Sequence, residues 1–150
     1  MPASRNVTTG NTSTTIKADG LIEALYNLKS QYISNATWIF HRDAVKNIRK
    51  LKDGEGNYIW QSGLADNKPA TILGRPYFMS EYAPNSFTAS QRVGIVGDFR
   101  FYAIATALQM QIQVLNELYA ATNQTGFIGR LEVDGMPTLA EAFSVVTLGA

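Results

Sequence analysis

The sequence predicts an α+β fold, with helices and short strands in its front part and longer alternating strands in its last third. Three observations support this: apolar residues recur first at helical spacing, short runs of β-forming residues separate the helices, and strict polar–apolar alternation follows. At 150 residues, 45% of them hydrophobic, the chain is long enough to bury a substantial core.

The front part is expected to begin with a flexible segment, residues 1–17, because its first fifteen residues are dominated by Ser, Thr, Asn and Gly. A helix is predicted over about 19–33, with Asp19 as its cap and leucines on one stripe. Residues 36–41 are predicted to form a short strand, and residues 43–52 a second helix capped by Asp43. The core predicted for this part comprises Leu25, Leu28, Ile39, Val45, Ile48 and Leu51.

The remaining segments read as strands separated by loops. Short strands are predicted at 71–73, 77–79 and 92–97, around glycine- and proline-containing turns. Alternation then predicts two strands, 107–115 and 125–134, each with one buried and one polar face. A last strand near 143–146 closes the chain.

The polar face of the first alternating strand is the most unusual feature of the sequence. Gln109, Gln111 and Gln113 make it polar, uncharged and flat, and the second strand adds Arg130 and Glu132. Such a face suits hydrogen bonding to a neighbouring sheet or subunit, and it equally suits contact with solvent. These five residues are the self-association candidates.

Composition excludes several classes of protein. The net charge of +1, from 13 basic and 12 acidic residues, argues against a sequence-specific or strongly electrostatic nucleic-acid binder. The absence of cysteine excludes disulfide scaffolds, thiolate metal sites and cysteine nucleophiles. No signal peptide and no apolar stretch of about 18 residues is visible, so no membrane partner is expected.

Catalytic chemistry finds little support in the residues. His41 is the single histidine, and there is no GxSxG segment to present a serine nucleophile. The Gly54-Glu55-Gly56 segment follows a helix and reads as a plain turn. We therefore expect no enzyme, and no catalytic, cofactor-binding or metal-binding residue or small-molecule substrate. The alternative is a small α/β hydrolase-like enzyme that uses His41 with Asp43 or Asp98.

Several segments, taken in order, resemble the family of tailed-bacteriophage major capsid proteins with the Hong Kong 97 fold. The resemblance covers about residues 17–148. Gly97-Asp98-Phe99-Arg100-Phe101-Tyr102-Ala103-Ile104 is similar to the family's GDF-x-x-Y-x-I motif. The other similar segments are Ala36-Thr37-Trp38-Ile39-Phe40-His41-Arg42-Asp43, Lys50-Leu51-Lys52-Asp53-Gly54, Trp60-Gln61-Ser62-Gly63-Leu64, Leu73-Gly74-Arg75-Pro76-Tyr77, Arg130-Leu131-Glu132-Val133-Asp134-Gly135 and Glu141-Ala142-Phe143.

The resemblance implies an axial domain over 18–106, with a mixed sheet flanked by helices. Residues 107–150 would be strands of the peripheral domain and a return to the axial region. The family's upstream arm, extended loop and spine helix find no counterpart before the first helix, so the chain looks like the back half of a capsid subunit. The residues that carry the motifs structurally would be Trp60, Gly97, Asp98, Phe99, Tyr102, Arg130, Asp134 and Gly135.

The same resemblance implies a structural role without turnover. The partners would be other copies of the capsid subunit. The protein would be located in the capsid of a virion and would be made in the cytoplasm of a bacterial host. Because the family's arm, loop and spine supply many lattice contacts, the isolated chain is expected to be a monomer or weak dimer.

Overall fold

The chain divides into two compact units in a computed structural model that describes residues 3–59, 71–115, 117–118 and 120–150. Unit 1 comprises Met1–Phe101 and Leu139–Ala150, and unit 2 comprises Tyr102–Thr138. The helices are α1 (Ala18–Tyr26), α2 (Ser30–Ile33) and α3 (Arg42–Arg49), with short 3-10 helices at Ala3–Arg5, Phe99–Phe101, Ala120–Thr122 and Ala140–Ala142. The strands are β1 (Asn6–Val7), β2 (Thr37–Phe40), β3 (Thr71–Ile72), β4 (Arg75–Met79), β5 (Arg92–Gly97), β6 (Tyr102–Leu115), β7 (Gly126–Pro137) and β8 (Phe143–Thr147).

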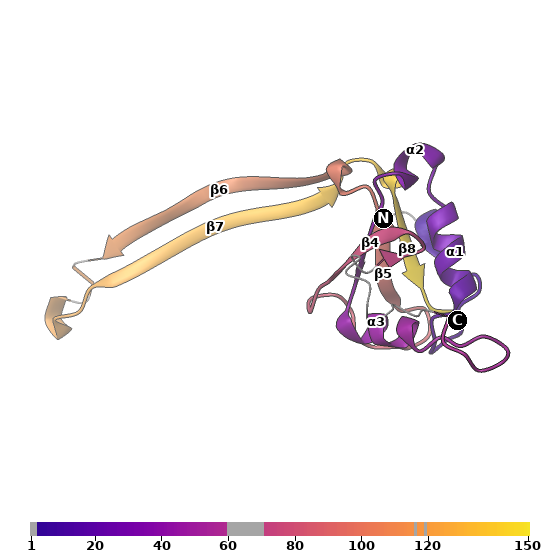
Figure 1. Ribbon diagram of the computed structural model, residues 1–150. Coiled ribbons are helices and arrows are strands. Elements are labelled where there is room, and N and C mark those ends of the chain that lie inside the picture. The colour runs from indigo at the N-terminus through magenta and orange to yellow at the C-terminus, as the bar shows by residue number, and fades with distance from the viewer. Residues whose placement is uncertain (1–2, 60–70, 116, 119) are drawn as a thin grey trace, which may run out of the picture. The chain divides into compact units, whose positions relative to one another are not determined.

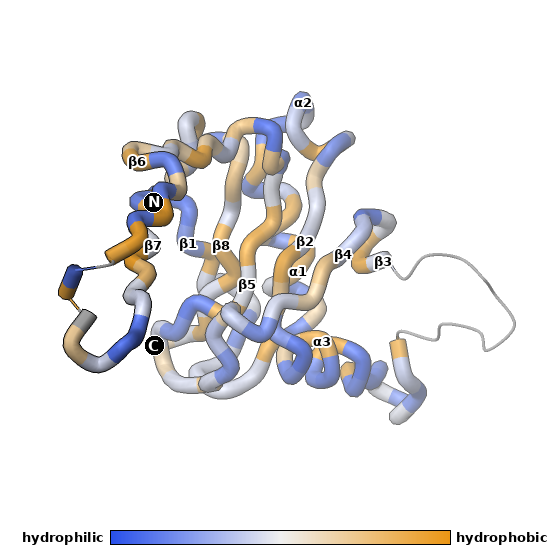
Figure 2. Tube along the Cα trace, turned by 90° about the vertical axis from the view of Figure 1, so that its left-hand side faces the viewer, coloured by the Kyte–Doolittle hydropathy of each residue, from blue (hydrophilic) through white to orange (hydrophobic). Residues whose placement is uncertain are grey.

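Unit 1 is built on a mixed six-stranded sheet in the order β1-β8-β5-β2-β4-β3. The pairs β1–β8 and β2–β4 are parallel, and the other neighbours are antiparallel. Helix α1 lies against one face of this sheet (Figures 1 and 2), and its buried side chains face β8 and the central strands. The predicted α+β class with a mixed sheet and flanking helices is confirmed.

The core of unit 1 is centred on β2. Trp38 and Phe40 are fully buried, and their rings stack at a centroid distance of 5.4 Å. Gly94, opposite Phe40 on β5, leaves room for that ring, since a Cβ there would lie 2.0 Å from it. The Trp38 indole N–H donates to the carbonyl of Ile72 at 3.1 Å, which links β2 to the outer strand β3.

The predicted core is correct except at Ile39. Leu25, Leu28, Val45 and Ile48 are buried in one cluster, and Leu51 packs partly buried against it. Ile39 is only half-buried and lies outside this cluster. Side chains alternate along a strand, so burying Trp38 and Phe40 turns Ile39 to the opposite face.

The capping residues predicted for the helices were wrong, although the predicted starts of the first helix and of the helix at residue 43 lie within one residue of the observed ones. The single helix expected over 19–33 is two helices, because α1 ends at Tyr26 and the backbone of Lys29 is extended before α2. α1 begins after Lys17, so Asp19 lies in its first turn. Likewise α3 is capped by His41, whose ring accepts the backbone N–H of Asp43.

The residues predicted as a flexible N-terminal segment pack on unit 1 in the structure. β1 pairs with β8, and Ile16 is buried in the core. The Asn11 side-chain amide donates to the carbonyl of Thr147, and the backbone N–H of Gly149 donates to Thr12. Two apolar side chains, Val7 and Ile16, together with polar and backbone hydrogen bonds therefore hold this segment on the sheet.

Candidate functional site

Unit 2 is a single antiparallel hairpin of β6 and β7 (Figure 1), and both strands are longer than the alternation predicted. Its register shifts twice, between Thr106 and Leu108 and between Leu108 and Gln111. Each shift places an extra residue in β6, which locally strengthens strand twist. The period-two pattern of β6 is therefore interrupted in the structure, although the sequence alternates without a break.

Four of the five self-association candidates share one face of this hairpin. Gln111 lies opposite Arg130, and Gln113 and Glu132 each lie two residues further along their strands, on the same side. Gln109 falls within the second register shift, where no paired residue fixes its side. All five are exposed. Their role in self-association remains a prediction.

The opposite face of the hairpin is apolar and exposed. Val114 pairs with Phe127, Ile112 pairs with Gly129, and Leu131 continues this side of β7. Phe127 is 69% exposed, Ile112 64% and Leu131 57%. Val133 and Ile104 extend the same side toward the base of the hairpin and are also exposed. We call these six residues, Ile104, Ile112, Val114, Phe127, Leu131 and Val133, the apolar hairpin face.

This exposure corrects the expectation that alternation marks a buried face. A two-stranded sheet has no second layer of its own and is marginally stable by itself. A row of large exposed apolar side chains of this kind is typical of a surface that another element or molecule covers. The apolar hairpin face is therefore the strongest candidate for a functional surface in the described residues.

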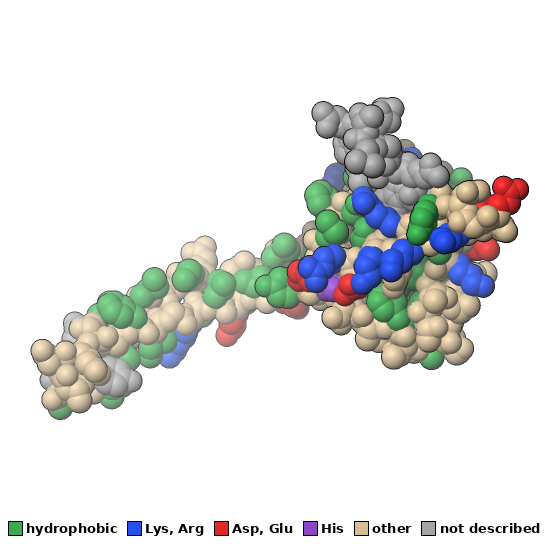
Figure 3. All heavy atoms as spheres, turned by 60° about the horizontal axis from the view of Figure 1, so that its bottom comes forward, with side chains coloured by type: hydrophobic (Ala, Val, Ile, Leu, Met, Phe, Trp, Pro, Cys, Tyr) green, Lys and Arg blue, Asp and Glu red, His purple; other side chains and the backbone are tan. Residues whose placement is uncertain are grey.

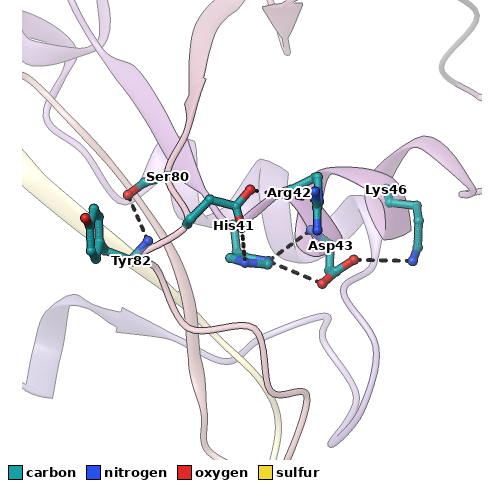
Figure 4. Close-up of polar contacts among 7 residues, drawn as sticks. His41, Arg42, Asp43, Lys46, Ser80 and Tyr82 are labelled. Carbon is teal, nitrogen blue, oxygen red and sulfur yellow. Dashed lines mark hydrogen bonds and ion pairs between the residues drawn. The ribbon is translucent and has the colours of Figure 1, made fainter.

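His41 lies in a row of alternating charges at the start of α3 (Figure 4). Its Nδ1 accepts the Asp43 backbone N–H at 3.1 Å, and its Nε2 lies 3.1 Å from a carboxylate oxygen of Glu81. Arg42 approaches Glu81 at 3.9 Å, and Lys46 pairs with Asp43 at 3.3 Å. The buried imidazole thus caps α3 and ties it to the chain that leaves β4.

The hydrolase-like alternative gains no support from this arrangement. The structure brings the Asp43 carboxylate to 3.5 Å from His41 Nδ1, but that nitrogen already accepts the Asp43 backbone N–H, and Nε2 faces Glu81. Asp98 lies beyond the start of β2 while His41 follows its end, so a strand rise of about 3.3 Å per residue separates them by roughly 15 Å. The described residues contain no group of three or more acidic or histidine side chains able to hold a metal.

Among the described residues, no helix is long and apolar enough to cross a membrane.

The Gly97-Asp98 segment is fixed by close packing and a buried charge. Asp98 is 1% exposed, and its carboxylate accepts the Arg100 guanidinium at 2.6 to 3.1 Å and the Arg100 backbone N–H at 3.1 Å. These bonds from Arg100 lower the pKa of Asp98. Gly97 has no room for a side chain, because a Cβ would lie 2.5 Å from the carbonyl oxygen of Ala142.

A comparison of the sequence with protein-family models identifies the family of this chain. The model of the phage capsid family matches residues 2–148. The chain belongs to the phage capsid family. A comparison with curated proteins gives no match.

Solved capsids share the fold of this family member. The capsid of an empty GTA particle matches with a TM-score of 0.80 and 25% identity over 97% of this chain, and that of a native GTA particle with 0.80 and 24% over 97%. A Gordonia phage Cozz structure matches with 0.67 and 15% over 99%. The fold is thus that of Hong Kong 97-like capsid proteins. The chain spans 49–51% of the length of these three.

The capsid-motif residues fall into two structural groups. In unit 1, Phe99 packs edge-on against Phe143 beside Gly97 and Asp98. In unit 2, a Cβ on Gly135 would lie 2.7 Å from the Tyr102 hydroxyl, so the glycine admits that ring, and the Asp134 carboxylate accepts the Gly135 N–H at 2.8 Å. Trp60 lies outside the described residues. These placements are structural facts, and the roles of the motif residues remain predictions.

Sequence reasoning passed over three contributors to these sites. Arg100 lies inside the GDF-like motif, and the signal for it was a basic residue two positions after Asp98. Glu81 lies in a loop and gave no signal. The apolar hairpin face was visible as alternation but was expected to be buried.

Proposed function

We propose that this chain is a structural part of a phage or prophage capsid subunit, which associates with other capsid chains to build an icosahedral shell. The observation that carries the proposal is the apolar hairpin face, which is exposed along most of unit 2. A surface of this kind is suited to burial against a protein layer. Membership of the phage capsid family supports the same role.

Unit 1 would be the axial region of the subunit, and unit 2 would be strands of the peripheral domain. The support is the arrangement of each unit by itself: a mixed sheet with helices in unit 1 and a long two-stranded hairpin in unit 2. The solved capsid chains are about twice as long as this chain, so their remaining length offers a cover for the hairpin. The protein would be made in a bacterial cytoplasm and act in the virion.

The energy available at the apolar hairpin face can be gauged from Phe127. A phenylalanine side chain can bury about 150–250 Å², and Phe127 is 69% exposed. Covering its exposed part would contribute about 3 kcal/mol at about 25 cal/mol per Å². That corresponds to roughly two orders of magnitude in affinity from this one side chain.

The experiment is co-assembly of the chain with full-length capsid subunits of the family, measured by co-sedimentation with shells or capsomers. Phe127→Ser and Leu131→Ser should each reduce incorporation strongly. Tyr82→Ser, which replaces a fully exposed aromatic side chain of unit 1 outside both faces of the hairpin, serves as the matched control. Circular dichroism of each variant verifies that the fold is intact.

Two results would overturn the proposal. One is the absence of incorporation by the folded unsubstituted chain. The other is equal incorporation of Phe127→Ser and the unsubstituted chain, which would mean that the apolar hairpin face is not covered in the assembly.

A further inference from the structure

Helix α3 and the turn after it concentrate the positive charge of the chain. Five of its 13 basic residues lie within residues 42–52, a stretch in which Asp43 is the one acidic residue. All five have exposed side chains. Figure 3 shows Lys and Arg side chains gathered along the face of unit 1 that carries α3. We call these residues, Arg42, Lys46, Arg49, Lys50 and Lys52, the α3 basic face.

The packing of α3 fixes this charge on one side. Ala44, Val45 and Ile48 are buried, which turns the positions between them outward. At 1.5 Å per residue, Arg42, Lys46 and Arg49 follow one another along the helix at intervals of about 6 and 4.5 Å. A row of closely spaced cations can neutralise several phosphates of a nucleic-acid strand.

The acidic neighbours compensate only part of this charge. Asp43 pairs with Lys46 at 3.3 Å, and Glu81 lies 3.9 Å from Arg42 and contacts His41. The cationic partners are 60% and 69% exposed, and pairs at such exposure contribute little and exchange readily for another anion. Asp53, just beyond the face, is occupied by the backbone N–H groups of its own turn.

The chemistry of the face favours a polyanion over a protein surface. Protein interfaces are centred on apolar or aromatic anchors and are depleted in charge at their core. The outward side chains of α3 are Arg42, Asp43, Lys46, Asn47 and Arg49, none of them apolar and three of them cationic against one anionic. Phosphate contacts need no apolar anchor and no base readout.

We propose that the α3 basic face binds the phosphate backbone of double-stranded DNA without reading its sequence. The inference rests on the proposed function, because the polyanion that a phage shell encloses is its genome. It is compatible with a net charge of +1, since the chain as a whole is nearly neutral and the cations are concentrated locally. An acidic surface on another capsid chain is the competing partner.

The test is fluorescence anisotropy of a labelled 20-base-pair DNA duplex titrated with the full chain between 50 and 200 mM salt. Each phosphate neutralised contributes about −0.9 to the slope of log K against log salt. The double variant Lys46→Gln, Lys50→Gln should therefore reduce the magnitude of the slope by about 2. The control Lys29→Gln, Arg130→Gln removes two cations elsewhere and should leave the slope unchanged.

Three outcomes would overturn the inference: no binding at 50 mM salt, equal slopes for the two double variants, or salt-sensitive association of the chain without DNA that Lys46→Gln, Lys50→Gln abolishes. The last would assign the face to a protein partner. The result is separable from the proposed function, because the lysine variant leaves the apolar hairpin face intact and should still co-assemble. Phe127→Ser should in turn still bind DNA.

Discussion

Asp98 is expected to be a pH-dependent stabilising residue of unit 1. Its carboxylate is buried and accepts bonds from one backbone N–H and from the Arg100 guanidinium. A hydrogen bond to a charged group stabilises the folded state by about 1.5–3 kcal/mol. A buried polar group left without a partner destabilises it by about 1–3 kcal/mol. Asp98→Ala removes the acceptor and leaves the Arg100 N–H unpaired, while the exposed guanidinium regains water. The expected loss is about 2–4 kcal/mol, or about 10 °C in Tm.

The sign of the pH dependence follows from the lowered pKa of Asp98, which is caused mainly by the Arg100 side chain. A carboxyl whose pKa is lower in the folded state stabilises that state above the unfolded pKa, near about 3.9 for Asp. The stabilisation is lost as the pH falls below that value toward the folded pKa. Asp98→Asn keeps the shape and an acceptor but should remove this acid-dependent component.

The assay is urea denaturation followed by circular dichroism between pH 2 and 7. Asp43→Asn, in which the altered carboxylate pairs with Lys46 at the surface, is the control and should cost less than about 1 kcal/mol. Equal losses for Asp98→Ala and Asp43→Asn would refute the reasoning. So would an Asp98→Asn stability profile that falls between pH 4 and 2 as steeply as that of the unsubstituted chain.

Four further predictions concern the core, the α3 cap, the glycine of the motif and the oligomeric state. Leu28→Ala should lower the free energy of unfolding, measured by urea denaturation, by about 2–5 kcal/mol. Ile39→Ala should lower it clearly less, because Leu28 is buried and Ile39 is half-buried. Equal losses would contradict the assignment of Ile39 to the less buried face of β2. His41→Ala should lower the free energy of unfolding by about 1 kcal/mol through loss of the α3 cap, and His41→Asn should restore it. Both variants should co-assemble with full-length subunits. Loss of co-assembly at unchanged Tm would show a further role for His41. Gly97→Ala should cost about 1–3 kcal/mol, since its Cβ would lie 2.5 Å from the Ala142 carbonyl oxygen, and an unchanged Tm would disprove that clash. Light scattering at micromolar concentration should find a monomer or weak dimer, and a stable pentamer or hexamer would contradict this.

The sequence alone determined the fold class and most of the strand positions. Periodicity placed the two hairpin strands, because side-chain alternation is a local property of extended backbone, and a short run of β-branched residues placed β5. The order of short motifs led to the phage capsid family, which the family model then matched over 2–148. The polar face carrying Gln111, Gln113, Arg130 and Glu132 was likewise readable from alternation.

Tertiary structure decided which candidates act together and which side of each element is covered. Ile39 and Trp38 are both apolar, so pattern alone could not tell which of them enters the core cluster. Capping depends on where the chain enters a helix, and this made His41 rather than Asp43 the cap of α3. The Arg100 side chain binds Asp98, and the Glu81 side chain lies against His41. The spacing of these residues in the sequence does not specify either contact. The exposure of the apolar hairpin face has the same cause: alternation defines a face, but only the packing of other elements decides whether that face is buried.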